Sequence, residues 1–135
     1  MGVIYIVEKG GDTVHSIADL KGQSIFAIGK GSTPEYALNY LMTAYGLNPA
    51  TDITVDWKSE ASEVVAAMAT TDHAIAMIPQ PFVTVAKTQI EDLLIQVSLT
   101  EAWDALNNGS TMITGTVIVR SEFAENHPEA VKQFL

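Results

Sequence analysis

Two glycines and two hydroxyl side chains gather in one short loop of the sequence AIGKGSTPEYALNYL, which covers residues 27–41. Gly29 and Gly31 allow a backbone with positive φ and a close approach to a ligand. The hydroxyls of Ser32 and Thr33, together with the free amides at the start of the following helix, are donors that suit an oxyanion. These residue types in this order predict a cradle for part of a ligand.

A structural role competes with the cradle. The run Ser32-Thr33-Pro34-Glu35 matches the capping box, in which Ser32 and Glu35 satisfy the amides of the helix's own first turn. The motif alone favours capping and leaves ligand binding open. The loop is neither a Walker loop nor a dinucleotide-binding turn, because its glycines lack the spacing that either motif requires.

Two further loops each join a predicted strand to a predicted helix. Ser59 and Glu60 lie in the first of them, where an ordinary N-cap at Ser59 or Ser62 is the alternative to a ligand contact. In the second, MIPQPFVT, prolines on both sides of Gln80 predict a stiff turn that holds its amide at the mouth of a buried strand. The alternative for this turn is a rigid connector.

No catalytic or metal-binding pattern stands out. The three histidines are far apart in the sequence, and neither H-E-x-x-H nor G-x-S-x-G occurs. The chain has no cysteine, which excludes disulfides, thiolate zinc sites and cysteine nucleophiles. We therefore expect no catalytic residues, no metal and no cofactor.

The composition narrows the choice of partners. Seven Lys and Arg residues against sixteen Asp and Glu residues give a net charge of -9, and the basic residues are scattered. Nucleic acid and anionic membrane surfaces are therefore poor partners. The 135 residues, 47% of them hydrophobic, suffice for one domain with its own core. Their longest apolar runs are far shorter than the roughly 20 residues of a membrane span, and the first residues show no targeting pattern.

Short runs rich in valine and isoleucine alternate with helical patterns. The helices are predicted over residues 33–45, 62–70 and 81–87, with a further one beginning at Pro128. This alternation predicts a three-layer α/β/α sandwich with a mostly parallel sheet, and a ligand beyond the carboxyl ends of its strands. The strands are predicted over residues 3–7, 24–28, 54–57, 74–78, 93–98 and 116–120.

Four stretches, in order over nearly the whole chain, carry a resemblance to a known family. They read DLKGQSIFAIGKGSTPEYALNYLM, WKSEASEVVAAMAT, AIAMIPQPFVTVA and TGTVIVRSEFAENHPEAVKQFL. The sequence resembles the substrate-binding proteins of ABC importers, and among them the branch for nitrate, taurine, aliphatic sulfonates and the thiamine pyrimidine precursor. The resemblance implies a type 2 periplasmic-binding-protein fold, with two α/β lobes that hold a small solute in the cleft between them.

By this resemblance, residues 1–135 form a single lobe, the second of the two, with crossing strands at 3–7 and 116–120. The implied partners are the solute, the importer's membrane subunits and the missing first lobe. Apolar surface left open by that lobe predicts self-association of the isolated chain. The resemblance also implies an extracytoplasmic location, either periplasmic or as a lipoprotein at the cell surface.

The resemblance places the ligand contacts in the loops that the strand-end rule also selects. Glu35 and Glu60 near the mouth of the cleft count against an anionic solute. The implied ligand-binding residues are Gly31, Ser32, Thr33, Ser59, Glu60, Gln80, Pro81, Thr114 and Gly115.

Two other classes of protein use the same scaffold. One is the effector-sensing domain of a bacterial transcription regulator, whose partner would be its own dimer mate. The other is an enzyme, which would need a nucleophile, a base or a metal that the sequence does not offer. The residues that precede Met1 in the full gene distinguish an importer protein from a regulator, because the former has a signal peptide or lipobox and the latter has a helix-turn-helix.

Overall fold

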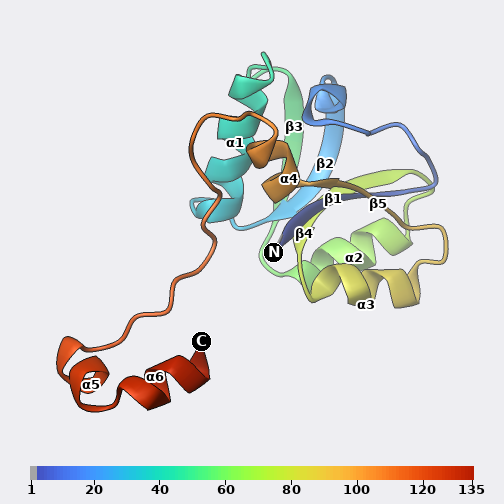
Figure 1. Cartoon of the computed structure of the whole chain (residues 1–135). Helices are drawn as coiled ribbons and strands as arrows, with labels where there is room; N and C mark the ends of the chain where they lie inside the picture. The colour runs from blue at the N-terminus through green and yellow to red at the C-terminus, as the bar shows by residue number, and fades with distance from the viewer. Residues whose placement is uncertain (1–2) are drawn as a thin grey trace.

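A five-stranded sheet forms the centre of the protein, whose computed structural model describes residues 3–135 (Figure 1). Its strands are β1 Ile4–Lys9, β2 Gln23–Ile28, β3 Ile53–Lys58, β4 Ala74–Pro79 and β5 Leu94–Ser98. They lie in the order β3-β2-β4-β1-β5. β2 pairs in parallel with β3 and β4, whereas β1 lies antiparallel between β4 and β5. Only β1 therefore runs against the common direction, and the predicted mostly parallel sheet is confirmed.

Helices cover both faces of this sheet. One face carries the 3-10 helix η1 Ile17–Leu20 and the helices α1 Thr33–Ala44 and α4 Leu99–Asp104. The other face carries α2 Ala61–Ala69 and α3 Phe82–Gln89. Two short helices, α5 Ser121–Asn126 and α6 Pro128–Phe134, lie away from the sheet (Figure 1). The three layers confirm the predicted α/β/α sandwich.

Alternating side chains divide the core into two clusters, one on each face. In β1, Ile4 and Ile6 pack with α1 and α4, whereas Val7 packs with α2 and α3. β4 alternates in the same way and is buried on both faces, as its run of alanine, isoleucine and methionine predicts. The helices contribute aliphatic side chains at helical spacing, such as Leu38 and Leu41 of α1.

The five strands of the sheet begin and end within two residues of the predicted bounds. Sequence reasoning missed η1, α4 and α5, which are only four to six residues long. The sixth predicted strand does not form within residues 3–135, where nothing pairs with residues 116–120, and its pairing with another lobe stays a prediction. Their valine and isoleucine content expresses β propensity, but a strand also needs a hydrogen-bonded neighbour.

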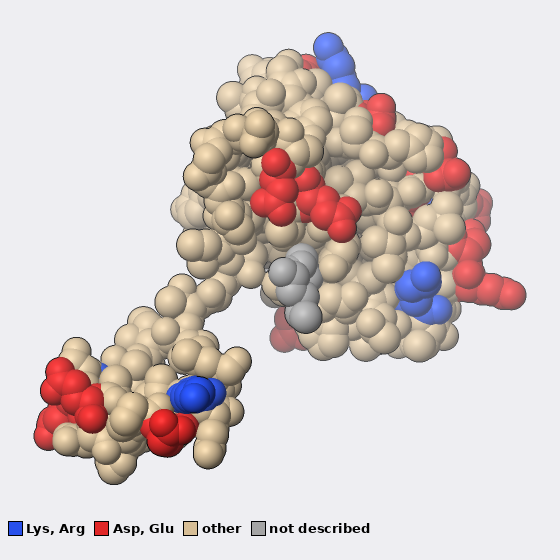
Figure 2. Space-filling view, in the orientation of Figure 1, with Lys and Arg blue, Asp and Glu red and all other residues tan. Residues whose placement is uncertain are grey.

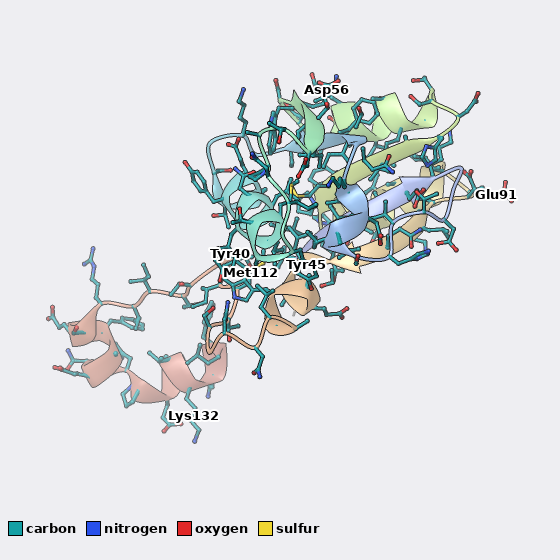
Figure 3. All side chains as sticks on the ribbon, turned by 90° about the horizontal axis from the view of Figure 1, so that it is seen from above. Tyr40, Tyr45, Asp56, Glu91, Met112 and Lys132 are labelled. Atoms are coloured by element: carbon teal, nitrogen blue, oxygen red, sulfur yellow. The ribbon has the colours of Figure 1, made fainter. Side chains whose placement is uncertain are left out.

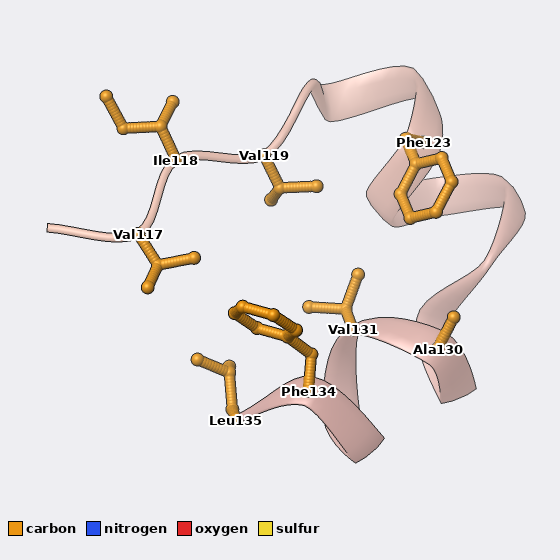
Figure 4. A pocket seen from close by; sticks show the side chains of 8 residues that line it. All are labelled: Val117, Ile118, Val119, Phe123, Ala130, Val131, Phe134 and Leu135. Carbon is orange, nitrogen blue, oxygen red and sulfur yellow. The ribbon is translucent and has the colours of Figure 1, made fainter.

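Residues 114–135, which we call the tail, stand apart from the sheet and its helices. Figure 1 and Figure 2 show the extended connection and the α5–α6 pair at a distance from the body of the protein. Within the tail, apolar side chains surround a hollow of 340 Å³, and Figure 4 shows Val119, Val131 and Phe134 directed toward one another. We call this hollow the tail groove; it is lined by Val117, Ile118, Val119, Phe123, Ala130, Val131, Phe134 and Leu135.

A buried carboxylate fixes the other end of β1. Glu8 is fully buried and accepts hydrogen bonds from both the backbone and the hydroxyl of Thr13, from Val14 N and from Gln96 Nε2. Its Oε1 also lies 2.8 Å from His73 Nε2. Burial alone would raise the pKa of Glu8, but these hydrogen bonds outweigh it and lower the pKa to about 2. Glu8 thus joins β1 to the following loop, to β5 and to the residue before β4.

The separation of the tail predicts that deleting residues 114–135 leaves the fold intact. The cut spares Met112, which is part of the core. We expect the melting temperature from circular dichroism to stay within about 2 °C of the full chain. Self-association, measured by sedimentation velocity, should fall because the exposed apolar side chains are gone. A loss of more than roughly 8 °C would show that the tail supports the core.

The Glu8 contacts predict an acid-sensitive fold. Since the folded pKa of about 2 lies below the ordinary 4.5, the Glu8 contribution is complete above pH 4.5 and is lost as the pH falls toward 2. Glu8→Gln should lower the free energy of unfolding at pH 7 by about 1–3 kcal/mol and flatten its dependence on pH in this window. Urea titrations at several pH values measure both. An unchanged acid slope, with Glu91→Gln as control, would contradict this role.

Candidate functional site

The carboxyl ends of β2, β3 and β4 meet at one edge of the sheet, which we call the strand-end edge. The parallel register pairs Ile28 with Lys58 and Ala27 with Met77, so the loops after these three strands emerge together. The loop after β2 lies between the other two, because β2 lies between β3 and β4. The structure therefore brings together seven of the predicted site residues: Gly31, Ser32, Thr33, Ser59, Glu60, Gln80 and Pro81.

The first loop has the backbone that its glycines predict. Gly29 and Gly31 have φ values of 85° and 75°, in the left-handed region. Ser32 turns back on the loop, since its backbone N–H and its hydroxyl both donate to Gly29 O, at 3.1 and 2.7 Å. A Cβ added at Gly29 would lie 2.7 Å from Pro34 Cγ. The loop is thus a tight turn that delivers the chain into α1.

The capping box predicted for Ser32 and Glu35 does not form. Ser32 occupies the N-cap position, but its hydroxyl donates to Gly29 O and accepts no hydrogen bond from the helix. Glu35 Oε2 accepts from Gly31 N at 2.6 Å rather than from the Ser32 amide. Glu35 therefore contacts the amide of Gly31, which is one residue earlier in the chain than the N-cap amide of a capping box.

The second loop repeats this arrangement with a different N-cap. Glu60 precedes α2, so neither Ser59 nor Ser62 is the N-cap. Glu63 Oε2 accepts from Ser59 N at 2.9 Å and from Glu60 N at 3.4 Å. The Ser62 hydroxyl donates to Glu60 Oε2 at 3.3 Å. A glutamate in the first turn of the helix again accepts from the loop that precedes it.

The third loop ties the edge to the start of β1. Gln80 N donates to Val3 O at 2.8 Å. The side-chain oxygen of Gln80 accepts from the Thr84 hydroxyl at 3.1 Å, which fixes the amide group against α3. Pro81 is exposed and immediately precedes this helix. The amide of Gln80 is thus held at the mouth of β4, as the two prolines predict.

Thr114 and Gly115 are the two predicted site residues that the structure leaves apart. Both are exposed in the extended connection to the tail. Within the described part of the chain, no hydrogen bond joins either residue to the three loops. The preceding residues 111–113 lie beside Thr33 instead. Contact of a ligand with any of the nine predicted residues stays a prediction.

Sequence reasoning missed an aromatic hollow beside the first loop. The Tyr40 ring stacks on Trp103, with ring centroids 4.3 Å apart, and Trp103 Nε1 donates to Ser110 Oγ. Figure 3 shows Tyr40 close to Met112, where the connection to the tail passes α1. The spacing of Tyr36 and Tyr40 on one helix face was the available signal. The hollow, of 230 Å³, is lined by Thr33, Tyr36, Ala37, Trp103, Thr111, Met112 and Ile113.

The side chains at this edge offer hydrogen-bonding groups. Hydroxyl, amide and carboxylate groups lie in the three loops, and the aromatic hollow adjoins the first of these loops at Thr33. Residues 3–135 contain no group of three histidine or acidic side chains that could hold a metal ion. In the same residues, no helix has the length and apolar character needed to span a membrane.

Comparison with known families identifies the chain. Residues 4–135 match the family described as the substrate-binding domain of ABC-type glycine betaine transport systems, and the chain belongs to this family. The resemblance to the substrate-binding proteins of ABC importers is therefore confirmed. Among curated proteins, none matches this chain.

Solved structures show the same fold. The alkanesulfonate-binding protein SsuA from Xanthomonas axonopodis pv. citri, bound to MOPS, is 21% identical with a TM-score of 0.60, over 98% of this chain and 44% of its own. The periplasmic aliphatic sulphonate-binding protein SsuA from Escherichia coli is 17% identical with a TM-score of 0.62, and the match covers 98% of this chain and 41% of that protein. An ancestral arginine-binding protein bound to glutamine is 19% identical with a TM-score of 0.57, and the match covers 98% of this chain and 53% of that protein. The chain thus spans about half the length of these proteins or less.

The geometry of the first loop predicts different costs at its two glycines. Gly29→Ala should destabilise the fold by about 1–3 kcal/mol, because the methyl group meets Pro34 and the backbone is left-handed. Gly31→Ala shares the backbone strain but meets no atom within 4 Å, so it should cost only about 1 kcal/mol. Chemical denaturation of both variants compares the two costs. Equal losses would contradict the contact between Gly29 and Pro34.

Proposed function

We propose that this chain is the second lobe of a bilobed solute-binding protein that delivers a small solute to an ABC importer. One observation carries the proposal. The family match covers residues 4–135, whereas the chain spans only 44% and 41% of the two sulfonate-binding relatives. The solute would lie against the strand-end edge, with the other lobe closing over it.

The tail supports a role for a second lobe. Its apolar side chains are largely open to solvent, with 89% of Ile118, 74% of Phe134 and 86% of Leu135 exposed. Apolar surface of this kind marks an interface. We propose that the first lobe packs on the tail groove, and that residues 116–120 pair there as the return crossing strand. In the isolated chain the same surface favours self-association.

The proposed mechanism is closure of a hinge without chemistry on the solute. β1 and residues 116–120 would be the two connections between the lobes, and the loops of the strand-end edge would face the cleft. Solute binding shifts the protein toward the closed form only by the difference in free energy between binding to the closed form and binding to the open form. The importer's membrane subunits would recognise the closed form, outside the cytoplasmic membrane.

Solute binding is tested by calorimetry on the protein expressed from the complete gene. The compounds are glycine betaine, methanesulfonate and arginine, the classes named for the family and the relatives. We expect one of them to bind the complete protein with a dissociation constant of ~1 μM. This chain alone should bind it only with a dissociation constant of ~1 mM, because on the order of half the free energy of the contacts is absent. Replacing Ser32 and Thr33 together by alanine should weaken binding by about 1–3 kcal/mol.

The control for this variant replaces Thr70 and Thr71 by alanine. These hydroxyls donate to carbonyls at the end of α2, at the opposite edge of the sheet, so solute affinity should not change. Melting curves of both variants measure the structural cost separately. If the Ser32 and Thr33 variant loses stability but keeps its affinity, the first loop serves only the fold and the solute binds elsewhere.

A further inference from the structure

Two backbone amides at the strand-end edge are already bound by carboxylates of the chain itself. Glu35 Oε2 accepts from Gly31 N at 2.6 Å, and Glu63 Oε2 accepts from Ser59 N at 2.9 Å. Amides that precede a helix are the donors that an oxyanion would use. Hydrogen bonds to an ionised acceptor are the stronger kind. A solute anion would have to displace a bound carboxylate at either loop.

The same device occurs twice. Glu35 is the third residue of α1 and Glu63 is the third residue of α2, and each reaches back to the loop before its helix. Negative charge at this position is also favoured by the helix dipole. At the start of both helices, a carboxylate of the chain itself therefore supplies the negative charge.

The charges around these loops add to the effect. Between residues 29 and 63, the loop stretches 29–35 and 56–63 contain four carboxylates and two lysines. The Lys58 ammonium forms an ion pair with Asp56 at 2.8 Å. The other lysine of these stretches, Lys30, is exposed in the first loop. An arriving anion would meet more negative than positive charge.

The remaining groups at the first loop suit a donor or a cation. The Ser32 hydroxyl donates its hydrogen bond to Gly29 O, so its oxygen offers only a lone pair to the solute. Tyr36 and Trp103 are among the residues that line the hollow beside Thr33, and aromatic side chains are groups that attract cations.

We propose that Glu35 and Glu63 close the first and second loops to oxyanions, so that the solute meets this lobe with a neutral hydrogen-bond donor or a positively charged group. The inference rests on the proposed function, because it assigns the chemistry of the same site. Glu35 and Glu63 are then specificity-determining residues. The sulfonate of the alkanesulfonate-binding relatives is excluded from these two loops.

The test is a nuclear magnetic resonance titration of the ¹⁵N-labelled chain with two probes of opposite charge. Sodium methanesulfonate and tetramethylammonium chloride are each compared with sodium chloride at equal ionic strength. In the unmodified chain, methanesulfonate should leave the amide signals of Gly31, Ser59 and Glu60 where sodium chloride leaves them. Tetramethylammonium should shift signals of the first loop and the adjacent aromatic hollow.

The variants Glu35→Gln and Glu63→Gln remove each charge and keep an oxygen that accepts from the loop. Each should gain a saturable methanesulfonate response at its own loop, where the unmodified chain shows none. Glu91→Gln is the control for net charge, since Figure 3 places Glu91 on the far side of the body from Tyr40. It should gain no response.

Two results would overturn the inference. One is a saturable methanesulfonate shift at Gly31 or Ser59 in the unmodified chain. The other is the absence of a gain in both glutamine variants, whose spectra also report that they are folded. Failure of the proposed function is a different result: no compound of the calorimetric series binds the complete protein, whatever the glutamine variants do.

Discussion

The antiparallel pairing of β1 with β4 and β5 is the constraint on which the rest of the structure depends. β1 inserts between two strands that share a direction, and it is buried on both faces by the two core clusters. Glu8 ties its far end to the next loop and to β5. Because β1 alone runs against the other strands, its first residues lie at the edge where β2, β3 and β4 end. The three loops and the entry of the chain therefore share one edge.

That edge combines rigidity with a distinct chemistry. Its loops are held by their own glutamates, by the turn at Gly29 and by the Gln80 contact with Val3. A loop fixed in this way can present hydroxyl and amide groups without ordering them when a solute arrives, which lowers the cost of binding. We propose that the same glutamates limit which solutes fit. On that proposal, the stability and the selectivity of this edge depend on the same side chains.

Much of this could be predicted from the sequence, and the misses have physical causes. Runs such as the one in β4 and the glycine turn after β2 depend on local patterns, so the strands, the sandwich and the three loops were predictable. The partner of Glu35 was not, because a one-residue change in the turn decides which amide it meets. The aromatic hollow depends on Trp103, which approaches α1 only in the folded chain. Residues 116–120 have the composition of a strand, but a pairing partner is not encoded locally.

The most direct test of the central claim is a crystal structure of the complete protein with its solute bound. We predict that the solute lies at the strand-end edge, within hydrogen-bond distance of Ser32 or Gln80, and that the other lobe covers the tail groove. Residues 116–120 would then be paired in a sheet. A solute bound away from the three loops, or a tail groove open to solvent in the closed protein, would contradict the account.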